Sequence, residues 1–319
     1  MDKRLMVSSS PHIRSNTTTQ KLMLDVVIAL IPASVAAVWF FGIRAAILII
    51  TTVISSVLFE YIIRRVLKRS NTIGDLSAVV TGLLLALNLP PALPVWMAIV
   101  GSFFAIVVVK QLFGGIGQNF VNPALAARAM LIVSYGSQMT SWTVPFTKAS
   151  GSSDLVSSAT PLEILKSGGE MPHLFDMFIG RVGGSLGEMS AVALIIGGVY
   201  LLVRRVISWH IPAIYCSTVF VLAWILGSNG AITLYPLYHI LSGGLLLGAI
   251  FMATDYTTSP MTKKGKVIYA FGCGFLTIVF RLYTNMPEGV SYAILLMNVA
   301  VPLIDRYTKP KRFGGGANV

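Results

Sequence analysis

Charge and cysteine are both scarce in this 319-residue sequence. Charged side chains make up 11 % of the residues, compared with about 25 % in a typical soluble domain, and 55 % of the residues are hydrophobic. So few charges cannot cover the surface of a soluble protein of this length, which excludes a soluble fold and predicts a chain embedded in lipid. The two cysteines, Cys216 and Cys273, form no C-x-x-C pair, which argues against a self-contained iron–sulfur or zinc site.

Hydrophobic runs of the length that a membrane helix needs, about 20 residues, recur along the chain. The first run begins at Leu22 and is too long for a cleavable signal, so we expect none. The sequence predicts an all-α polytopic membrane protein with about ten transmembrane helices. We expect them near residues 22–41, 45–63, 76–89, 93–110, 122–138, 188–203, 211–228, 236–253, 267–283 and 289–305.

The basic residues predict how these helices are oriented. The formal net charge is +12, but Lys and Arg stand at the ends of the hydrophobic runs, which indicates membrane topology and not a nucleic-acid-binding face. With ten helices, 18 of the 24 basic residues lie on one side of the membrane. Because an excess of Lys and Arg marks the cytoplasmic side, both termini are predicted to be cytoplasmic and the loop 139–187 extracytoplasmic.

Two stretches of the sequence resemble each other and predict an internal repeat. TGLLLALNLPP begins at Thr81 and GGLLLGAIFMATD at Gly243, and each is followed about 40 residues later by an Asn-containing segment with a nearby Pro. Five helices in each half would make the halves inverted repeats with half-length or broken helices, an architecture typical of transporters. The segment 76–89 would then be a half-length helix, ended by two prolines.

The predicted organisation has five parts. They are a cytoplasmic N-terminal segment (1–21), a first five-helix repeat (22–138), an extracytoplasmic loop (139–187), a second five-helix repeat (188–305) and a cytoplasmic tail (306–319).

The large loop contains a short segment that differs from the polar linker around it. Thr160, Pro161 and Glu163 have the spacing of a helix cap, with a Thr N-cap, a Pro at the first helical position and a Glu at the third. Asp154–Thr160, which reads DLVSSAT, also resembles the flavinylation motif D-x-x-[ST]-[GS]-A-T. The final Thr of that motif carries FMN through a phosphoester bond, and the two interpretations are compatible.

Four long segments together resemble the NqrB/RnfD family of membrane subunits, found in sodium-pumping NADH:quinone reductases and Rnf electron-transport complexes. They are LLLALNLPPALPVW (83–96), KQLFGGIGQNFVNPALAARAML (110–131), DLVSSATPL (154–162) and GGLLLGAIFMATDYTTSP (243–260). Gln111, where the quinone-reductase branch usually has Glu, and the short segment before the first helix favour the Rnf branch. Ser158 stands where the motif usually has Gly.

The resemblance implies a fold, a function and cofactors. The fold would be similar to that of urea transporters. The function would be electron transfer within an Rnf-type ferredoxin:NAD oxidoreductase that is coupled to Na⁺ or H⁺ translocation. Thr160 would carry covalent FMN, and Asp154, Ser158 and Ala159 would be recognised by a flavin transferase. A second, non-covalent flavin, riboflavin, is implied within the helix bundle.

The implied partners are the other Rnf subunits (A, B, C, E and G) and the lipid bilayer of a bacterial cytoplasmic membrane, with no nucleic acid. Two alternatives stay open: an NqrB-type subunit of the sodium-pumping quinone reductase, and a flavin-free channel or transporter for a small solute. The latter would explain the repeat but not DLVSSAT.

A few polar residues in or near the predicted helices are further candidates. Asp255, in ATDYTTSP, is either a residue of a helix-ending turn or an anionic group on an ion path. We expect Arg128 to be paired within the bundle and His239 to be a hydrogen-bonded core residue.

Overall fold

The computed structural model describes residues 17–146, 159–167, 169–227, 234–284 and 289–309. Asp154 and Ser158 lie outside the described residues. Five helices of the described chain are long and apolar enough to cross a membrane. They are α1 (Thr19–Phe41), α2 (Ile43–Val66), α10 (His210–Gly227), α13 (Lys263–Tyr283) and α14 (Val290–Tyr307).

A second set of apolar helices is shorter. It comprises α3 (Ser77–Leu87), α4 (Val95–Phe103) with its π-helical continuation η2 (Phe104–Gln111), α5 (Pro123–Ser134) and α9 (Ala191–Val203). The remaining short elements are η1 (Ile73–Asp75), α6 (Gly136–Met139), α7 (Pro161–Ser167) and α8 (Leu174–Ile179). The short α3 confirms the half-length helix predicted over 76–89.

The helix predicted over 236–253 is broken. It consists of α11 (Tyr235–Leu241), α12 (Leu245–Leu247) and the π-helical η3 (Gly248–Met252), with a bend of 62° between the two halves. Gly243 and Gly244 at the break both have φ +66°, a left-handed conformation that side chains with a Cβ rarely adopt. Hydropathy alone shows a continuous apolar run here and therefore does not indicate where the helix breaks.

Two other predicted boundaries are also corrected. The helix expected over 122–138 ends at Ser134 and is followed by the separate α6. The helix expected from residue 188 begins at Ala191, because Ser190 caps it by accepting a hydrogen bond from the Ala193 amide.

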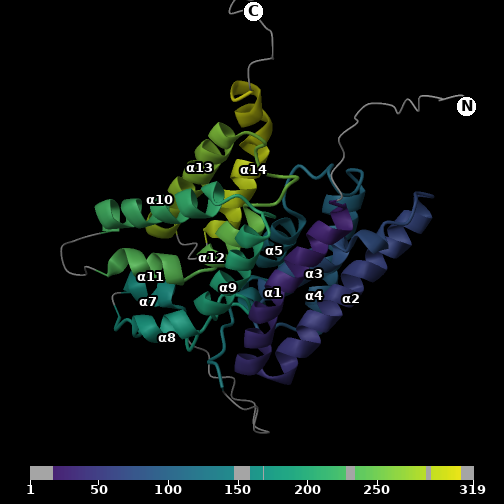
Figure 1. Cartoon of the computed structure of the whole chain (residues 1–319). Helices are drawn as coiled ribbons and strands as arrows, with labels where there is room; N and C mark the ends of the chain where they lie inside the picture. The colour runs from purple at the N-terminus through teal and green to yellow at the C-terminus, as the bar shows by residue number, and fades with distance from the viewer. Residues whose placement is uncertain (1–16, 147–158, 168, 228–233, 285–288, 310–319) are drawn as a thin grey trace, which may run out of the picture.

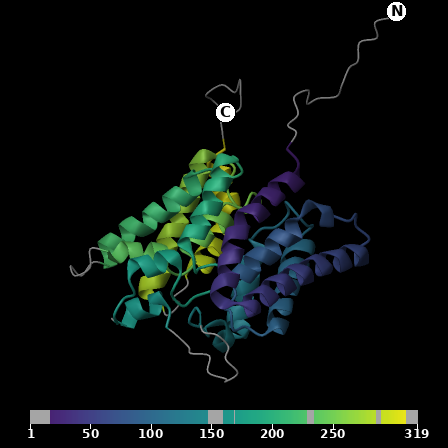
Figure 2. The ribbon, with the colours of Figure 1, turned by 60° about the horizontal axis from the view of Figure 1, so that its bottom comes forward.

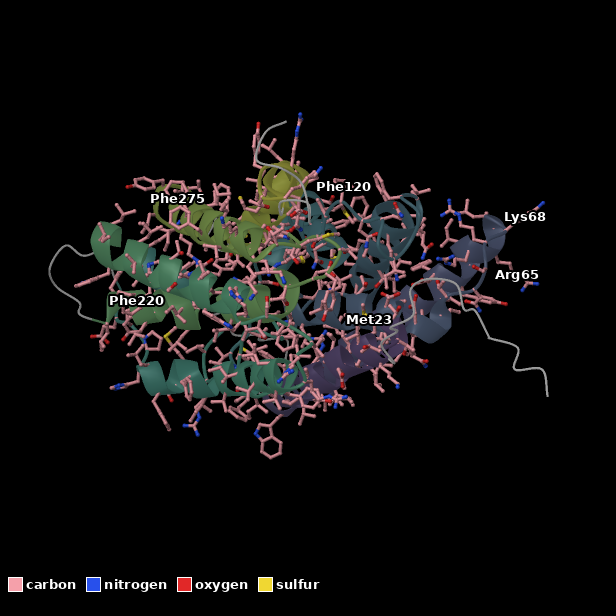
Figure 3. All side chains as sticks on the ribbon, turned by 45° about the horizontal axis from the view of Figure 1, so that its top comes forward. Met23, Arg65, Lys68, Phe120, Phe220 and Phe275 are labelled. Carbon is pink, nitrogen blue, oxygen red and sulfur yellow. The ribbon has the colours of Figure 1, made fainter. Side chains whose placement is uncertain are left out.

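Helices from the two halves of the sequence form two groups that lie side by side. Figure 2 shows the purple-to-blue N-terminal helices on one side and the green-to-yellow C-terminal helices on the other. The start of α1 and the end of α14 lie at one end of the molecule, and α7 and α8 lie at the opposite end (Figure 1). Arg65 and Lys68, both exposed, project from the same end of α2 (Figure 3).

The two groups meet through α1 and α9 and through the half-length helices. An added Cβ on Gly197 of α9 would collide with the backbone oxygen of Ala29 on α1, so these helices approach closely. At the end of α3, the Asn88 amide donates to the sulfur of Met252, at the end of η3, over 3.6 Å. The ends of α3 and η3 therefore meet inside the protein, where their polar backbone is shielded from lipid.

Candidate functional site

Thr160 is the N-cap of α7, as the sequence predicts. Its hydroxyl accepts a hydrogen bond from the Glu163 amide over 3.3 Å, and its own amide donates to the Glu163 carboxylate over 3.0 Å. Pro161 occupies the first helical position. Ala159 is exposed, whereas Thr160 is only 6 % exposed and lines a small cavity with Glu188 and Gly243. The structure therefore buries the hydroxyl to which the resemblance assigns FMN against the helices.

A larger cavity lies beside Thr160. It has a volume of about 250 Å³, and Lys166, Tyr235, His239 and Arg281 contribute to its walls. Leu162 lines both this cavity and the small one at Thr160. Small-molecule sites enclose roughly 300–1,000 Å³, so the volume approaches that of a site for a compact ring system.

His239 corrects the expectation of a hydrogen-bonded core residue. Its side chain is 2 % exposed, but neither ring nitrogen has a hydrogen-bond partner among the described residues. Next to it, the Arg281 guanidinium donates to the carbonyl oxygens of His239, Ser242 and Gly243, and so holds the break between α11 and α12 together. The position of His239 in an apolar run does not reveal that its nitrogens are left unpaired.

Asp255 lies just after η3 and lines a different cavity, of about 80 Å³. Its carboxylate accepts hydrogen bonds from the Thr257 hydroxyl (2.8 Å), the Thr258 hydroxyl (3.2 Å) and the Thr257 amide (3.5 Å). Burial raises the pKa of Asp255 above its ordinary value, and these hydrogen bonds oppose the rise. The structure therefore has the helix-ending turn and also places the carboxylate at a cavity wall.

The Asp255 cavity is bordered by the Lys110 side chain, which belongs to a buried ion pair. The Lys110 ammonium lies 2.7 Å from the Glu60 carboxylate and donates to the Ser77 hydroxyl over 2.6 Å. Lys110 ends the predicted helix 93–110 and is one of the 18 basic residues on the predicted cytoplasmic side, but it is 2 % exposed and points into the protein. Glu60 is not among the candidates named from the sequence, although a carboxylate within an apolar span is by itself a signal of a polar partner.

Arg128 is paired within the bundle, as predicted. Its guanidinium donates to the Asn88 side-chain oxygen over 2.7 Å and lies 3.5 Å from the Glu188 carboxylate. Because Glu188 lines the small cavity with Thr160, the polar contacts of Arg128 extend from the end of α3 to the candidate attachment site. The sequence could not name these partners, which lie 40 and 60 residues away.

No three His, Cys, Asp or Glu side chains lie close enough to hold a metal ion in the part of the chain that the structure describes. Cys216 and Cys273 are free thiols.

The apolar helices define a polytopic membrane protein. Residues 6–314 match the NQR2, RnfD, RnfE family, and the chain therefore belongs to that family.

Several named members of this family are similar to the chain over almost its whole length. The D subunit of the Na⁺-translocating ferredoxin:NAD⁺ oxidoreductase complex of Acetobacterium woodii is 52 % identical over 97 % of this chain and 95 % of the relative. The D subunit of the proton-translocating ferredoxin:NAD⁺ oxidoreductase complex of Clostridium ljungdahlii is 46 % identical over 97 % of this chain and 96 % of the relative. The D subunit of the ion-translocating oxidoreductase complex of Stutzerimonas stutzeri is 40 % identical over 94 % of each chain.

Proposed function

We propose that this chain is the D subunit of an Rnf-type, ion-translocating ferredoxin:NAD⁺ oxidoreductase and carries electrons within that complex. The observation that supports this most strongly is the 52 % identity, over 97 % of the chain, to a relative with that activity in its name. The other relatives described above have names of the same kind. The proposed cellular location is a bacterial cytoplasmic membrane, where the chain would contact the other subunits (A, B, C, E and G).

The proposed electron carrier is FMN, attached to Thr160 through a phosphoester. Bound there, the isoalloxazine ring would supply the redox chemistry, and the protein would supply position, burial and charge. Thr160 offers a hydroxyl at a defined helix start, and a cavity of about 250 Å³ lies beside it. Because Thr160 is 6 % exposed, the flavin transferase must act before α7 docks or on a chain in which α7 has moved out.

The finer architecture that we propose has ten transmembrane helices in two inverted five-helix repeats, similar to the urea-transporter fold. Similar side-chain contacts in the two halves support it. Lys110, at the end of η2, donates to Ser77 at the start of α3, and Arg281, near the end of α13, donates to the Ser242 and Gly243 carbonyls just before α12. In each half, a buried cation at the end of the fourth helix thus holds the start of the half-length helix.

The proposed topology places both termini in the cytoplasm and the loop 139–187 outside. The start of α1 and the end of α14 lie at one end of the molecule, opposite α7 and α8, as this topology requires (Figure 1). Asp255 would then lie on the cytoplasmic side, where its carboxylate could support ion-coupled electron transfer.

A non-covalent riboflavin in the bundle is also part of the proposal. The cavity at Asp255, of about 80 Å³, is well below the roughly 300 Å³ at which small-molecule sites begin. We therefore assign no residues to this flavin.

Absorption spectroscopy tests the proposal. The full chain is expressed together with a flavin transferase, purified under denaturing conditions and examined in the visible range, with Thr160→Ala as the control. An electron carrier retains flavin absorption that Thr160→Ala lacks. A colourless wild-type chain would favour the flavin-free channel. A flavin-bearing chain that assembles with subunits of a quinone reductase, and not with Rnf subunits, would favour the NqrB-type alternative.

A further inference from the structure

The larger cavity beside Thr160 has the features of a binding site. We name it the His239 cavity, after the one buried imidazole in its wall. Its walls come from α7, from α11 and from the end of α13, so that the helix carrying Thr160 at its start forms one side of it. Leu162, two residues after Thr160, lines the cavity.

The unpaired state of His239 indicates a ligand. The side chain is 2 % exposed, and neither Nδ1 nor Nε2 has a hydrogen-bond partner within the described chain. Buried polar side chains in proteins are nearly always hydrogen-bonded, because leaving them unpaired in an apolar environment is costly. Tyr235 contacts the imidazole edge-on, with 4.8 Å between ring centroids, and so limits its reorientation.

The charge of the cavity indicates the kind of ligand. Lys166 and Arg281 both line it, and among the residues that the structure describes no acidic side chain lines it. The ammonium of Lys166 donates to the Thr284 carbonyl, and both terminal nitrogens of Arg281 donate to carbonyls, so these hydrogen bonds leave both charges in place. Glu188, which lines the neighbouring cavity at Thr160, offsets part of the charge of Arg281. Partial burial lowers the pKa of Lys166, in keeping with its place at the cavity. Such a site favours a ring system that accepts hydrogen bonds and carries negative charge.

We propose that the His239 cavity receives the flavin ring that is tethered to Thr160. His239 is then a positioning residue that hydrogen-bonds the polar edge of the ring. Lys166 and Arg281 favour the reduced, anionic ring over the oxidised, neutral one and so raise the reduction potential of the flavin. This inference rests on the proposed attachment of FMN to Thr160, which supplies the tether.

The test uses the full chain, expressed with a flavin transferase and purified in detergent. Mass spectrometry of the Thr160 peptide first establishes the adduct. The reduction potential of the covalent flavin and its quenching by iodide are then measured in wild type, His239→Phe, His239→Gln and Lys166→Gln. His210→Phe is the matched control, because His210 also leaves its Nδ1 unpaired but does not line the cavity.

We expect His239→Phe to keep the adduct, to shift the potential to more negative values and to increase iodide quenching several-fold. His239→Gln, which retains a hydrogen-bonding group, should restore most of the wild-type potential, and His210→Phe should change nothing. Lys166→Gln should also shift the potential to more negative values. If His239→Phe does not fold, the potential of Lys166→Gln tests whether the flavin ring binds in the cavity.

Two results would overturn the inference in different ways. An adduct on Thr160 whose potential and quenching are unchanged in the His239→Phe and Lys166→Gln chains would refute the docking alone. A wild-type chain without the adduct would refute the proposed attachment, and the docking would fall with it.

Discussion

The Lys110 ammonium and the Glu60 carboxylate form an ion pair of 2.7 Å, with side chains that are 2 % and 1 % exposed. Glu60 also accepts hydrogen bonds from the Thr72 hydroxyl and the Gln111 amide, and Lys110 donates to Ser77 at the start of α3. This pair therefore joins α2, α3 and the end of η2 beside the cavity that Asp255 lines.

Removing one partner of this pair should destabilise the protein strongly. Lys110→Met leaves the Glu60 carboxylate buried without its cation, and breaking such a pair costs about 3–5 kcal/mol. The double variant Lys110→Met/Glu60→Gln should recover much of that loss, because a neutral amide can keep the contacts to Thr72 and Gln111. Thermal unfolding in detergent measures both, with exposed Lys68→Met as a control that should change little. A double variant less stable than Lys110→Met would contradict this account.

Asp255→Asn should reduce ion-dependent turnover of the assembled complex. Burial raises the pKa of Asp255, so the folded protein takes up a proton there at a higher pH than an exposed Asp would. If turnover needs the carboxylate, activity should fall as the pH decreases through that raised pKa, and Asp255→Asn should lose this acidic limb of the profile. Asp176→Asn, which removes the charge from an exposed contact of 4.0 Å to Arg181, is the control. Wild-type turnover in Asp255→Asn would leave Asp255 as a turn residue only.

Gly197→Ala should destabilise the contact between α1 and α9. The new Cβ would meet the backbone oxygen of Ala29, which cannot move without shifting α1. Overpacking of this kind costs about 1–3 kcal/mol. Gly136→Ala is a matched control, because nothing lies within 4 Å of its added Cβ. Equal stability of the two variants would show that α1 and α9 do not pack as closely as described.

Cysteine labelling in intact cells should reveal the orientation of the chain. In a background without Cys216 and Cys273, a Cys introduced at Ser152 should react with a membrane-impermeant reagent. A Cys in place of Lys68, exposed at the end of α2, should react only after the membrane is opened. The opposite pattern of protection would invert the proposed topology.

The sequence predicts best those features that depend on neighbouring residues. The apolar runs, the half-length α3 and the cap made by Thr160 and Glu163 follow from hydropathy, from prolines and from a spacing of three residues. Broken helices are predicted and the bent α11–η3 segment is one, but the sequence does not place the break at Gly243 and Gly244, because a glycine pair in an apolar run is compatible with a continuous helix.

Features that depend on distant contacts could not be predicted. Lys110 and Glu60 are 50 residues apart, and Arg128 and Glu188 are 60 apart, so only the packing of the helices brings them together. His239 belongs to the same class, because its unpaired nitrogens result from what α7 and α13 place around it.

Mass spectrometry of the peptide that contains Thr160 tests the central claim most directly. The chain is expressed with a flavin transferase, and Thr160→Ala is the matched variant. Loss of the N-cap should cost only about 1 kcal/mol, so the variant should still fold and insert. The account predicts an FMN adduct on Thr160 in the wild type and no covalent flavin in Thr160→Ala. An unmodified Thr160, or an adduct on a neighbouring Ser, would contradict it.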